Sequence, residues 1–417
     1  MRPPTARPRL PTEILDTIFA NLSKNHLEPL LVANAFVSTV ATRRLYQNVT
    51  LARPAAVVAF LRTILANPRL PPLVRSLDIN MTKARDADEG HAKARPTGNF
   101  YALLSRALRA TTALTALALE LPKAHAPLWI FAGCTFRLRQ FTTSMYCRRP
   151  LARFLETQAS LEELTLRGYP TDAVFALAPE ALPRLRAFNA VHADAALIRA
   201  VVQGRPVRVV SVPLFPEMSL ASLDALRAGT APLLRLSVIS FDPTAPGFLF
   251  EALAQRFQEL EALHLVMLMA EYNQELLEQS AAVLSNFKRL KYITFMAAPT
   301  RPAAPALDAA EADIAKRWHR HCPTLRTIIL PKGRVWFQNA PEVPPGVSAG
   351  AAAVAAALAG AGAETEESED DDIEDWDAEE GGHGGGMDMP VLSFSMEHGV
   401  QEVPGGAQPV VEEWAEL

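Results

Sequence analysis

The feature that most constrains the fold of this 417-residue sequence is a short apolar frame that recurs along most of the chain. In each copy an apolar residue is followed three positions later by a second one, and two positions after that by a third, with conservative replacements. The last two alternate with surface-type residues, which is the pattern of a β-strand with one buried face. Ten copies follow one another at intervals of 22 to 40 residues, beginning at Val74, Leu114, Leu138, Leu161, Leu185, Val207, Leu233, Leu260, Leu290 and Leu325.

The spacing of these frames predicts a repeating α/β fold. Most intervals lie near the period of about 20–29 residues that is typical of leucine-rich repeats, and helix-forming stretches such as residues 248–257 lie between frames. One strand and one helix cannot bury their apolar faces alone, so stacked units share a core. We expect residues 51–340 to form a curved α/β solenoid of degenerate leucine-rich repeats, with an atypical first copy at Tyr46. The alternative is a chance scatter of leucines.

The charge of the chain is divided unevenly along its length. Residues 341–417 contain 19 acidic and no basic residues, whereas the first 340 residues carry 41 basic and 26 acidic ones. An Ala/Gly-rich segment at 348–363 precedes an acidic segment at 364–380, and neither can bury enough apolar surface to offset its ordering entropy. We therefore expect a disordered linker and acidic tail over 341–417, a disordered arm over 1–9 and an exposed loop at 83–98.

Sequence patterns of catalysis are missing, including the G-x-S-x-G elbow, the Walker loop and the H-E-x-x-H helix. His319, His321 and Cys322 could be imagined as zinc ligands, but they directly precede a frame and no second ligand pair is visible, which favours a core or helix-capping role. The basic residues are dispersed, which favours a solvated surface over a nucleic-acid interface. We expect a protein that is not an enzyme, holds no metal or cofactor, and binds no nucleic acid.

The cysteines and the apolar runs bear on the compartment of the protein. Cys134, Cys147 and Cys322 show no C-x-x-C spacing, which favours a reducing compartment. The first residues lack the apolar region of a signal peptide, and the longest apolar runs, such as residues 262–270, are too short to span a bilayer. We therefore expect a soluble protein of the cytoplasm and/or the nucleus that does not bind membranes.

Residues 10–50 follow a different pattern and predict short helices. In RLPTEILDTIFANL, residues 9–22, five apolar residues lie on one helical stripe: Ile14, Leu15, Ile18, Phe19 and Leu22. This stretch resembles the F-box pattern L-P-x-E-I-L-x-x-I-F-x-x-L, beginning at Leu10 and Pro11 and including Glu13. The downstream apolar residues also fit an F-box: Leu27, Leu30 or Leu31, Val32, Phe36, Leu45 and Tyr46. Ala33 and Asn34 depart from it, because many F-boxes have Cys and a basic residue there.

The order of F-box, degenerate leucine-rich repeats and acidic tail is similar to the large F-box families of mushroom-forming fungi. The resemblance implies a three-helix F-box at 10–50 that docks a Skp-type adaptor, and through it a cullin, while the repeats hold a protein substrate for ubiquitination. By position, the adaptor would meet Leu10, Pro11, Ile14, Leu15, Ile18 and Phe19. Two alternatives stay open: the first helix caps the repeats, or the protein is a scaffold that acts without a ligase.

The residues between the apolar positions of each frame predict where a substrate would bind, because they point to the opposite face of the strand. Early frames expose polar or small residues, such as Ser76, Asp78 and Asn80. The later frames expose a more apolar set, namely Ile239, His264, Val266, Tyr292, Thr294, Met296 and Ile329. Because an apolar patch on a solvent face usually marks binding, we predict the substrate site in the C-terminal half of the concave face.

Overall fold

The computed structural model describes residues 10–82, 98–121, 127–170, 175–216, 218–272, 274–299, 307–331, 335–337 and 411–413. All of them belong to one of the chain's two compact units, residues 1–338 with 411–417. The second unit, residues 339–410, lies outside the described residues. The predicted arm at 1–9, nearly all of the predicted loop at 83–98 and the acidic segment at 364–380 also lie outside them.

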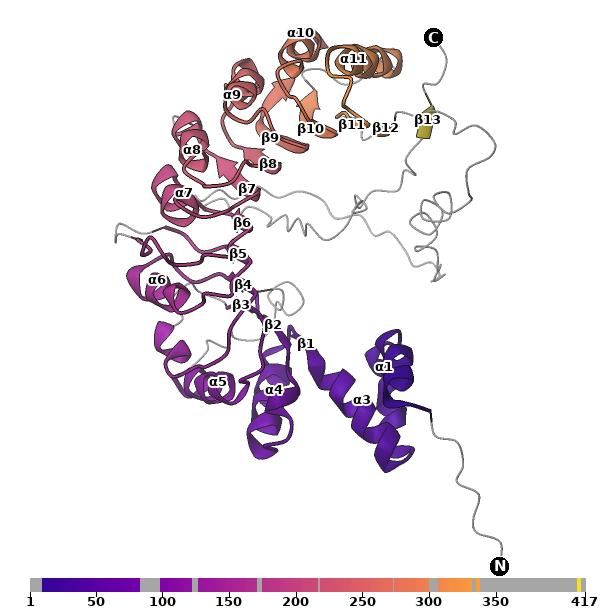
Figure 1. The fold of residues 1–417 in the computed structure, drawn as a ribbon, viewed down its shortest axis with the longest axis vertical. Coiled ribbons are helices and arrows are strands. Elements are labelled where there is room, and N and C mark those ends of the chain that lie inside the picture. The colour runs from indigo at the N-terminus through magenta and orange to yellow at the C-terminus, as the bar shows by residue number, and fades with distance from the viewer. Residues whose placement is uncertain are drawn as a thin grey trace, which may run out of the picture. The chain divides into compact units, whose positions relative to one another are not determined.

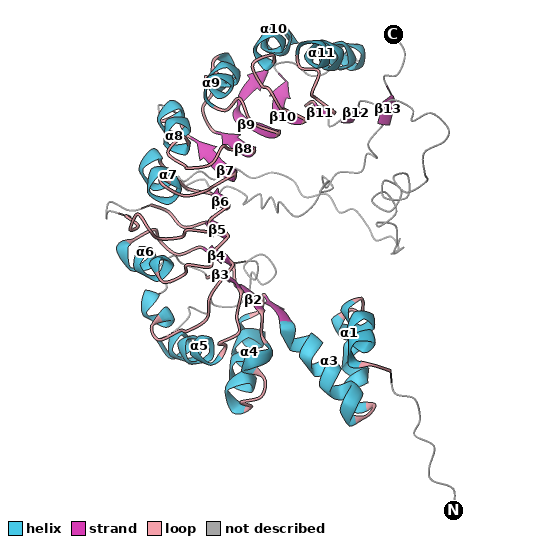
Figure 2. Cartoon of the chain, viewed as in Figure 1, coloured by secondary structure: helices cyan, strands magenta, loops and turns pink. Residues whose placement is uncertain are grey.

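The described chain is a mixed α/β structure (Figures 1 and 2). Its α-helices are α1 (Thr12–Ala20), α2 (Lys24–Leu27), α3 (Ala35–Gln47), α4 (Pro54–Ala66), α5 (Gly98–Ala110), α6 (Arg149–Glu156), α7 (Ala195–Val202), α8 (Ser219–Leu226), α9 (Leu249–Arg256), α10 (Gln274–Leu284) and α11 (Leu307–His321). Short 3-10 helices are η1 (Glu28–Val32), η2 (Pro71–Leu73), η4 (Leu128–Phe131) and η5 (Ala245–Gly247). Within the described ranges, no helix combines the length and the apolar character needed to cross a membrane.

The strands form one sheet whose order follows the sequence. They are β1 (Asn48–Leu51), β2 (Ser76–Asn80), β3 (Ala116–Glu120), β4 (Gln140–Thr143), β5 (Glu163–Leu166), β6 (Ala187–Ala190), β7 (Val209–Leu214), β8 (Arg235–Ser240), β9 (Ala262–Tyr272), β10 (Tyr292–Pro299), β11 (Thr327–Ile329), β12 (Val335–Phe337) and β13 (Val411–Glu413). Neighbours from β1 to β11 are parallel, β12 is antiparallel to β11, and β13 is parallel to β12. Figure 1 shows α4 to α11 along the outer face of the curved sheet.

Each strand from β2 to β11 comes from one of the ten frames, and equivalent frame residues lie side by side. The second apolar residues are aligned from strand to strand as Leu77, Leu117, Phe141, Leu164, Phe188, Val210, Leu236, Leu263, Ile293 and Ile328. All three residues of every frame are buried. Val49 of β1 is aligned with Leu77, so the atypical first copy also contributes a strand. The fold is therefore α/β and repeat-like, as the spacing predicts.

The helices α1 to α3 have a small core of their own. It contains Leu15 and Phe19 of α1, Leu27 of α2, and Val40 and Ala41 of α3, and it is separate from the core beneath the sheet. Asn34, one of the two residues that depart from the F-box pattern, caps α3: its Oδ1 accepts the backbone N–H groups of Phe36 (3.1 Å) and Val37 (3.0 Å). An Asn at this position satisfies amides that the helix itself leaves unpaired.

Arg205 is an arginine buried inside the repeat core, where its exposed fraction is only 2%. Its guanidinium donates to the carbonyls of Ala178 (2.9 Å) and Ala181 (2.8 Å) and to three carbonyls at or just after the end of α7, those of Ala200, Val201 and Gln203. Terminal carbonyls of a helix lack partners within the helix, and a cation suits the negative end of the helix dipole. Arg205 thus joins α7 to the preceding unit.

Replacing Arg205 with Ala is expected to lower the free energy of unfolding by about 3 kcal/mol or more, because several buried carbonyls lose their donor. Urea unfolding followed by circular dichroism measures this as a lower midpoint. Arg208 is exposed and lies just before β7, so the control Arg208→Ala should change stability by less than about 0.5 kcal/mol. Equal effects of the two substitutions would contradict the role given to Arg205.

Candidate functional site

Helix α1 has two apolar sides, where the sequence predicts a single stripe. Leu15 and Phe19 are 8% and 6% exposed and pack inside the helical core, whereas Ile14 and Ile18 are 48% and 46% exposed. Leu10 and Pro11, which precede the helix, are exposed as well. The six residues predicted to meet an adaptor therefore separate into two groups. Leu15 and Phe19 are covered by this chain's own helices, and we name the other four, Leu10, Pro11, Ile14 and Ile18, the N-terminal surface.

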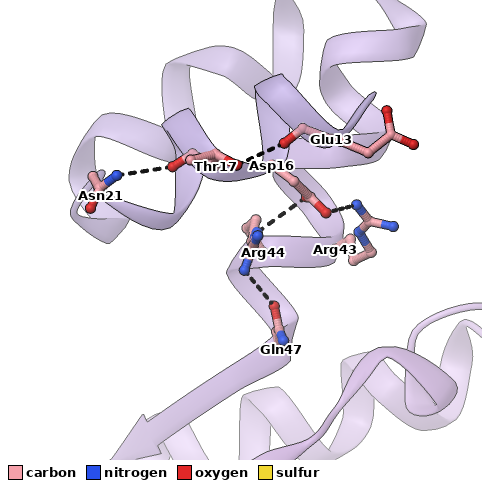
Figure 3. A network of polar contacts seen from close by, with 7 residues as sticks. All are labelled: Glu13, Asp16, Thr17, Asn21, Arg43, Arg44 and Gln47. Carbon is pink, nitrogen blue, oxygen red and sulfur yellow. Dashed lines mark hydrogen bonds and ion pairs between the residues drawn. The ribbon is translucent and has the colours of Figure 1, made fainter. Parts of the chain in front are cut away.

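A polar network joins α1 to α3 and holds one side of α1 against α3. Figure 3 shows Asp16 of α1 beside Arg43 and Arg44 of α3. Its carboxylate accepts from the Arg43 guanidinium and, at 3.1 Å, from Nε of Arg44, whose Nη1 donates to Oε1 of Gln47 (3.1 Å). The hydrogen bond from Arg43 is the main reason that the pKa of Asp16 lies below its ordinary value, although partial burial opposes the shift. With Asp16, Leu15 and Phe19 all held against α3, Ile14 and Ile18 are left toward solvent.

Two further apolar residues of this region are exposed. Val32, at the end of η1, and Phe36, in the first turn of α3, both present large apolar side chains to solvent. Both belong to the downstream half of the stretch that resembles the F-box, and neither was predicted as an adaptor contact. Their exposure adds apolar area to the same helical region.

The parallel register brings the predicted substrate residues together on adjacent strands. His264, Thr294 and Ile329 are aligned across β9, β10 and β11. Ile239, Val266 and Met296 are aligned across β8, β9 and β10, and Tyr292 begins β10. All seven side chains are partly or fully exposed, and they alternate with the buried frame residues. They lie on the side of the sheet opposite the frame residues, which we name the strand face.

Sequence reasoning missed the continuation of this surface toward β6. Val191, just after β6, and Pro213 of β7 occupy the position equivalent to Ile239, so an apolar row consists of Val191, Pro213, Ile239, Val266 and Met296; Pro213 is buried and the other four are partly exposed. Two residues past Pro213 and Ile239, the rings of Phe215 and Phe241 are stacked with centroids 5.3 Å apart. The alternation of inward and outward residues, continued beyond each frame, would have identified these positions.

The opposite end of the same row is polar. Glu120 of β3 accepts from Asn80 of β2 (3.1 Å) and from Arg167, the residue after β5 (3.2 Å). Two buried atoms next to this cluster have no hydrogen-bond partner among the described residues: Nε of Arg167 and Oδ1 of Asn189. Thr165 is paired with Asn189 in the sheet, so Arg167 and Asn189 lie on neighbouring strands. Level with this row, the outward residues are thus polar or charged over β2–β5 and apolar over β6–β10.

Exposed arginines lie at or just before the first residues of β6, β7 and β8, at Arg186, Arg208 and Arg235. Arg235, the first residue of β8, is exposed; its backbone N–H donates to the carbonyl of Arg208 (3.0 Å), and its guanidinium makes no hydrogen bond or ion pair within the described ranges. Burial, and then the positive charge of Arg235, lower the pKa of His264 from its ordinary value. The imidazole is therefore neutral at pH 7, and Arg235 lies on β8 four residues before Ile239 of the apolar row.

The cluster considered as zinc ligands lies at the end of α11. Cys322 is buried; its N–H donates to the carbonyl of Trp318 (2.9 Å) and its Sγ lies 3.9 Å from the carbonyl of Phe287. Nδ1 of His319 lies 3.1 Å from the carbonyl of Leu325, and His321 is exposed. Burial raises the pKa of Cys134 to about 11 and that of Cys147 to about 12, so both thiols are protonated at pH 7. Among the described residues, no three His, Cys, Asp or Glu side chains are grouped to hold a metal.

Comparisons with known proteins place this chain in no family. No family model matches the sequence, and no curated protein matches it. Among solved structures, the crystal structure of the Rad7 and Elc1 complex in yeast contains a similar chain, at 13% sequence identity and a TM-score of 0.34. The alignment covers 81% of this chain and 92% of that one. At this TM-score the likeness is weak, and no conclusion about function is taken from it.

The packing of α1 on α3 is expected to depend on pH through Asp16. Because its pKa is lower in the folded protein, the stabilisation is present above the unfolded pKa, near 3.8, and is lost as pH falls through the folded value. Amide hydrogen exchange should therefore show α1 losing protection as the pH falls below the unfolded pKa of Asp16, by more in the wild type than in Asp16→Asn. Glu28→Gln, at an exposed acid of η1, should behave as the wild type does. Identical profiles for wild type and Asp16→Asn would contradict this account.

Proposed function

We propose that this protein is the substrate-recognition subunit of a Skp–cullin–F-box ubiquitin ligase. In this proposal α1 to α3 form an F-box that docks the adaptor, and β1 to β12 with their helices form the leucine-rich-repeat solenoid that holds a protein substrate. The chain itself performs no catalysis, since ubiquitin transfer belongs to the partner subunits. The protein acts in the cytoplasm and/or the nucleus.

The observation that carries the proposal is the exposure of Leu10, Ile14 and Ile18, while the opposite side of α1 is packed on α3. Ile14 and Ile18 are four residues apart on α1, the spacing at which an amphipathic helix places its anchors in an apolar groove of a partner, and Leu10 precedes the helix. A group of large apolar side chains exposed this close together in the sequence supports a binding surface, because single scattered apolar residues are the general property of soluble surfaces. The separate core of α1 to α3 also supports this reading over the alternative, in which α1 covers the end of the repeats.

Replacing both Ile14 and Ile18 with Ala is expected to abolish binding of a Skp-type adaptor. Two interface anchors at about 2 kcal/mol each correspond to a loss of roughly a thousandfold in affinity. Because both side chains are about half exposed in the free chain, the fold should be unaffected, which thermal unfolding checks. Isothermal titration of the full chain with the adaptor measures the affinity.

The matched control is Leu220→Ala, at a residue of α8 that is as exposed as Ile18; it should bind the adaptor normally. Leu15→Ala should instead destabilise the helical core by about 2–5 kcal/mol. An adaptor that binds the Ile14/Ile18 variant normally, or that does not bind the wild type, would leave the scaffold that acts without a ligase as the function.

The strand face is expected to be required for substrate capture and not for adaptor binding. Thr294→Glu with Met296→Glu places two charges beside Val266 and His264, where burial against an apolar partner would be costly. In cells treated with a proteasome inhibitor, proteins that accumulate on the Ile14/Ile18 variant should be lost from the Thr294/Met296 variant. The latter should still co-purify with the adaptor. Unchanged recovery of these proteins would contradict the placement of the substrate site.

A further inference from the structure

A cavity at one edge of the sheet carries positive charge that the proposed function does not use. It lies where the chain enters β10 and β11 and has a volume of about 290 Å³. This volume is at the lower end of the range of ligand pockets, about 300–1,000 Å³, so it suits a few side chains of a ligand. Four of the six described residues that line it are cationic and none of the six is acidic. The six are Lys288, Arg289, Lys291, Pro323, Thr324 and Arg326.

Hydrogen bonds between neighbouring units hold the lining residues in place. Lys291 and Arg326 occupy equivalent positions directly before β10 and β11, and the N–H of Arg326 donates to the carbonyl of Lys291 (2.8 Å). Oγ1 of Thr324 donates to the carbonyl of Leu290 (2.7 Å). The cationic side chains therefore start from a fixed backbone, so that a ligand would not have to order the segments that carry them.

Two carboxylates next to the cavity neutralise its cations only in part. Glu261 pairs with Arg289 (2.9 Å) and with Lys291 (3.2 Å). Glu259 lies 3.9 Å from Lys288 and 4.0 Å from Arg289, which is beyond hydrogen-bond distance. Four cations against these two carboxylates leave an excess of two positive charges.

Arg326 and Lys288 are the two lining cations that can take up new anions. Arg326 is exposed, and its guanidinium makes no hydrogen bond or ion pair within the described part of the chain. A guanidinium presents its N–H donors in a planar fork that matches a carboxylate. The side chain of Lys288 is 64% exposed and has only the long contact to Glu259. The cavity thus offers donors to two carboxylates, one at each of these residues.

The surroundings of the cavity favour an acidic segment of a protein over other anions. Tyr292, which directly follows Lys291, is 46% exposed, and tyrosine and arginine are enriched among the residues that contribute most to protein–protein binding. A free anion would leave Tyr292 without a contact. A nucleic acid would place further phosphates beside Glu261, which precedes β9 at the position equivalent to Lys291, and beside Glu259. A short acidic segment avoids this repulsion.

We propose that this cavity binds a protein partner through a segment with two or more neighbouring acidic side chains. One carboxylate pairs with Arg326 and another with Lys288, and the adjoining residues of the segment lie against Tyr292. The inference goes beyond the proposed function, since it holds for a ligase subunit and for a scaffold alike. It requires no adaptor.

Fluorescence anisotropy with the full-length protein tests the proposal at about 50 mM NaCl, where charges are weakly screened. The probe is a labelled peptide with three consecutive glutamates flanked by leucines; a second peptide with glutamines in their place should not bind. Lys288→Glu with Arg326→Glu should weaken binding of the acidic peptide about tenfold or more, because two attractions become repulsions. The matched control Arg186→Glu with Arg208→Glu reverses two exposed arginines before β6 and β7, and it should change binding by less than about twofold.

A substitution of opposite sign tests the role given to the charge balance. Glu259→Gln removes a carboxylate that competes for Lys288 and Arg289, so the acidic peptide should bind about threefold more tightly, the worth of one exposed ion pair. Tyr292→Ala should weaken binding about threefold or more. Tripolyphosphate should displace the probe only at about ten times the concentration that the unlabelled peptide requires, because it cannot contact Tyr292. Circular dichroism of each variant checks that the fold is retained.

The inference is overturned if the acidic peptide does not bind, if the two double variants weaken its binding equally, if tripolyphosphate displaces it as readily as the peptide does, or if Glu259→Gln or Tyr292→Ala leaves the affinity unchanged. Binding that appears only after the acidic residues of 364–380 are replaced with Asn and Gln would also overturn it, since the ligand would then be the chain's own acidic segment. Adaptor binding is measured separately through Ile14 and Ile18. A protein that binds the adaptor but no acidic peptide contradicts only this inference, and one that binds the peptide but no adaptor contradicts only the ligase assignment.

Discussion

The parallel backbone pairing from β1 to β11 is the interaction on which the rest of the structure depends. One amide before each strand bonds to the carbonyl at the same place in the preceding unit, for example Arg208 to Arg186 and Lys291 to Glu261. This repetition keeps equivalent residues side by side, so that Phe188 meets Leu164 and Val210 in the core. It also sets which residues meet on the opposite face. The apolar row exists because the register is not lost between β6 and β10.

In the helical region at the N-terminus, the orientation of α1 decides which apolar residues are buried. A short helix with a wide apolar stripe must cover one part of it and leaves the rest for other contacts. Here Asp16 pairs with Arg43 and Arg44 of α3. Leu15 and Phe19, on the same side of α1, pack in the helical core. The ion pair thus selects the inner side, and the outer side keeps Ile14 and Ile18. Charge placement and the binding surface are linked through one helix orientation.

The sequence predicts the strands well and the details of the surfaces less completely. Each frame combines strand periodicity with burial, so the alternation alone locates the strands and the side each residue faces. The division of the α1 stripe depends on contacts with α3, about thirty residues away in the sequence, and periodicity cannot reveal it. Arg205 is buried because carbonyls of residues 178 and 181 converge on it, which only the folded chain brings about. Phe215 and Phe241 were missed because they lie outside the frames.

The sequential strand order has a consequence for how such a protein changes over evolutionary time. Every strand between β1 and β11 is hydrogen-bonded only to the units before and after it. Duplication or deletion of one unit in this range would therefore leave all other pairings in register. Each added unit would lengthen the strand face by about 4.8 Å and bring its own outward side chains. Ligand preference could then change by copying a unit, without redesign of the core.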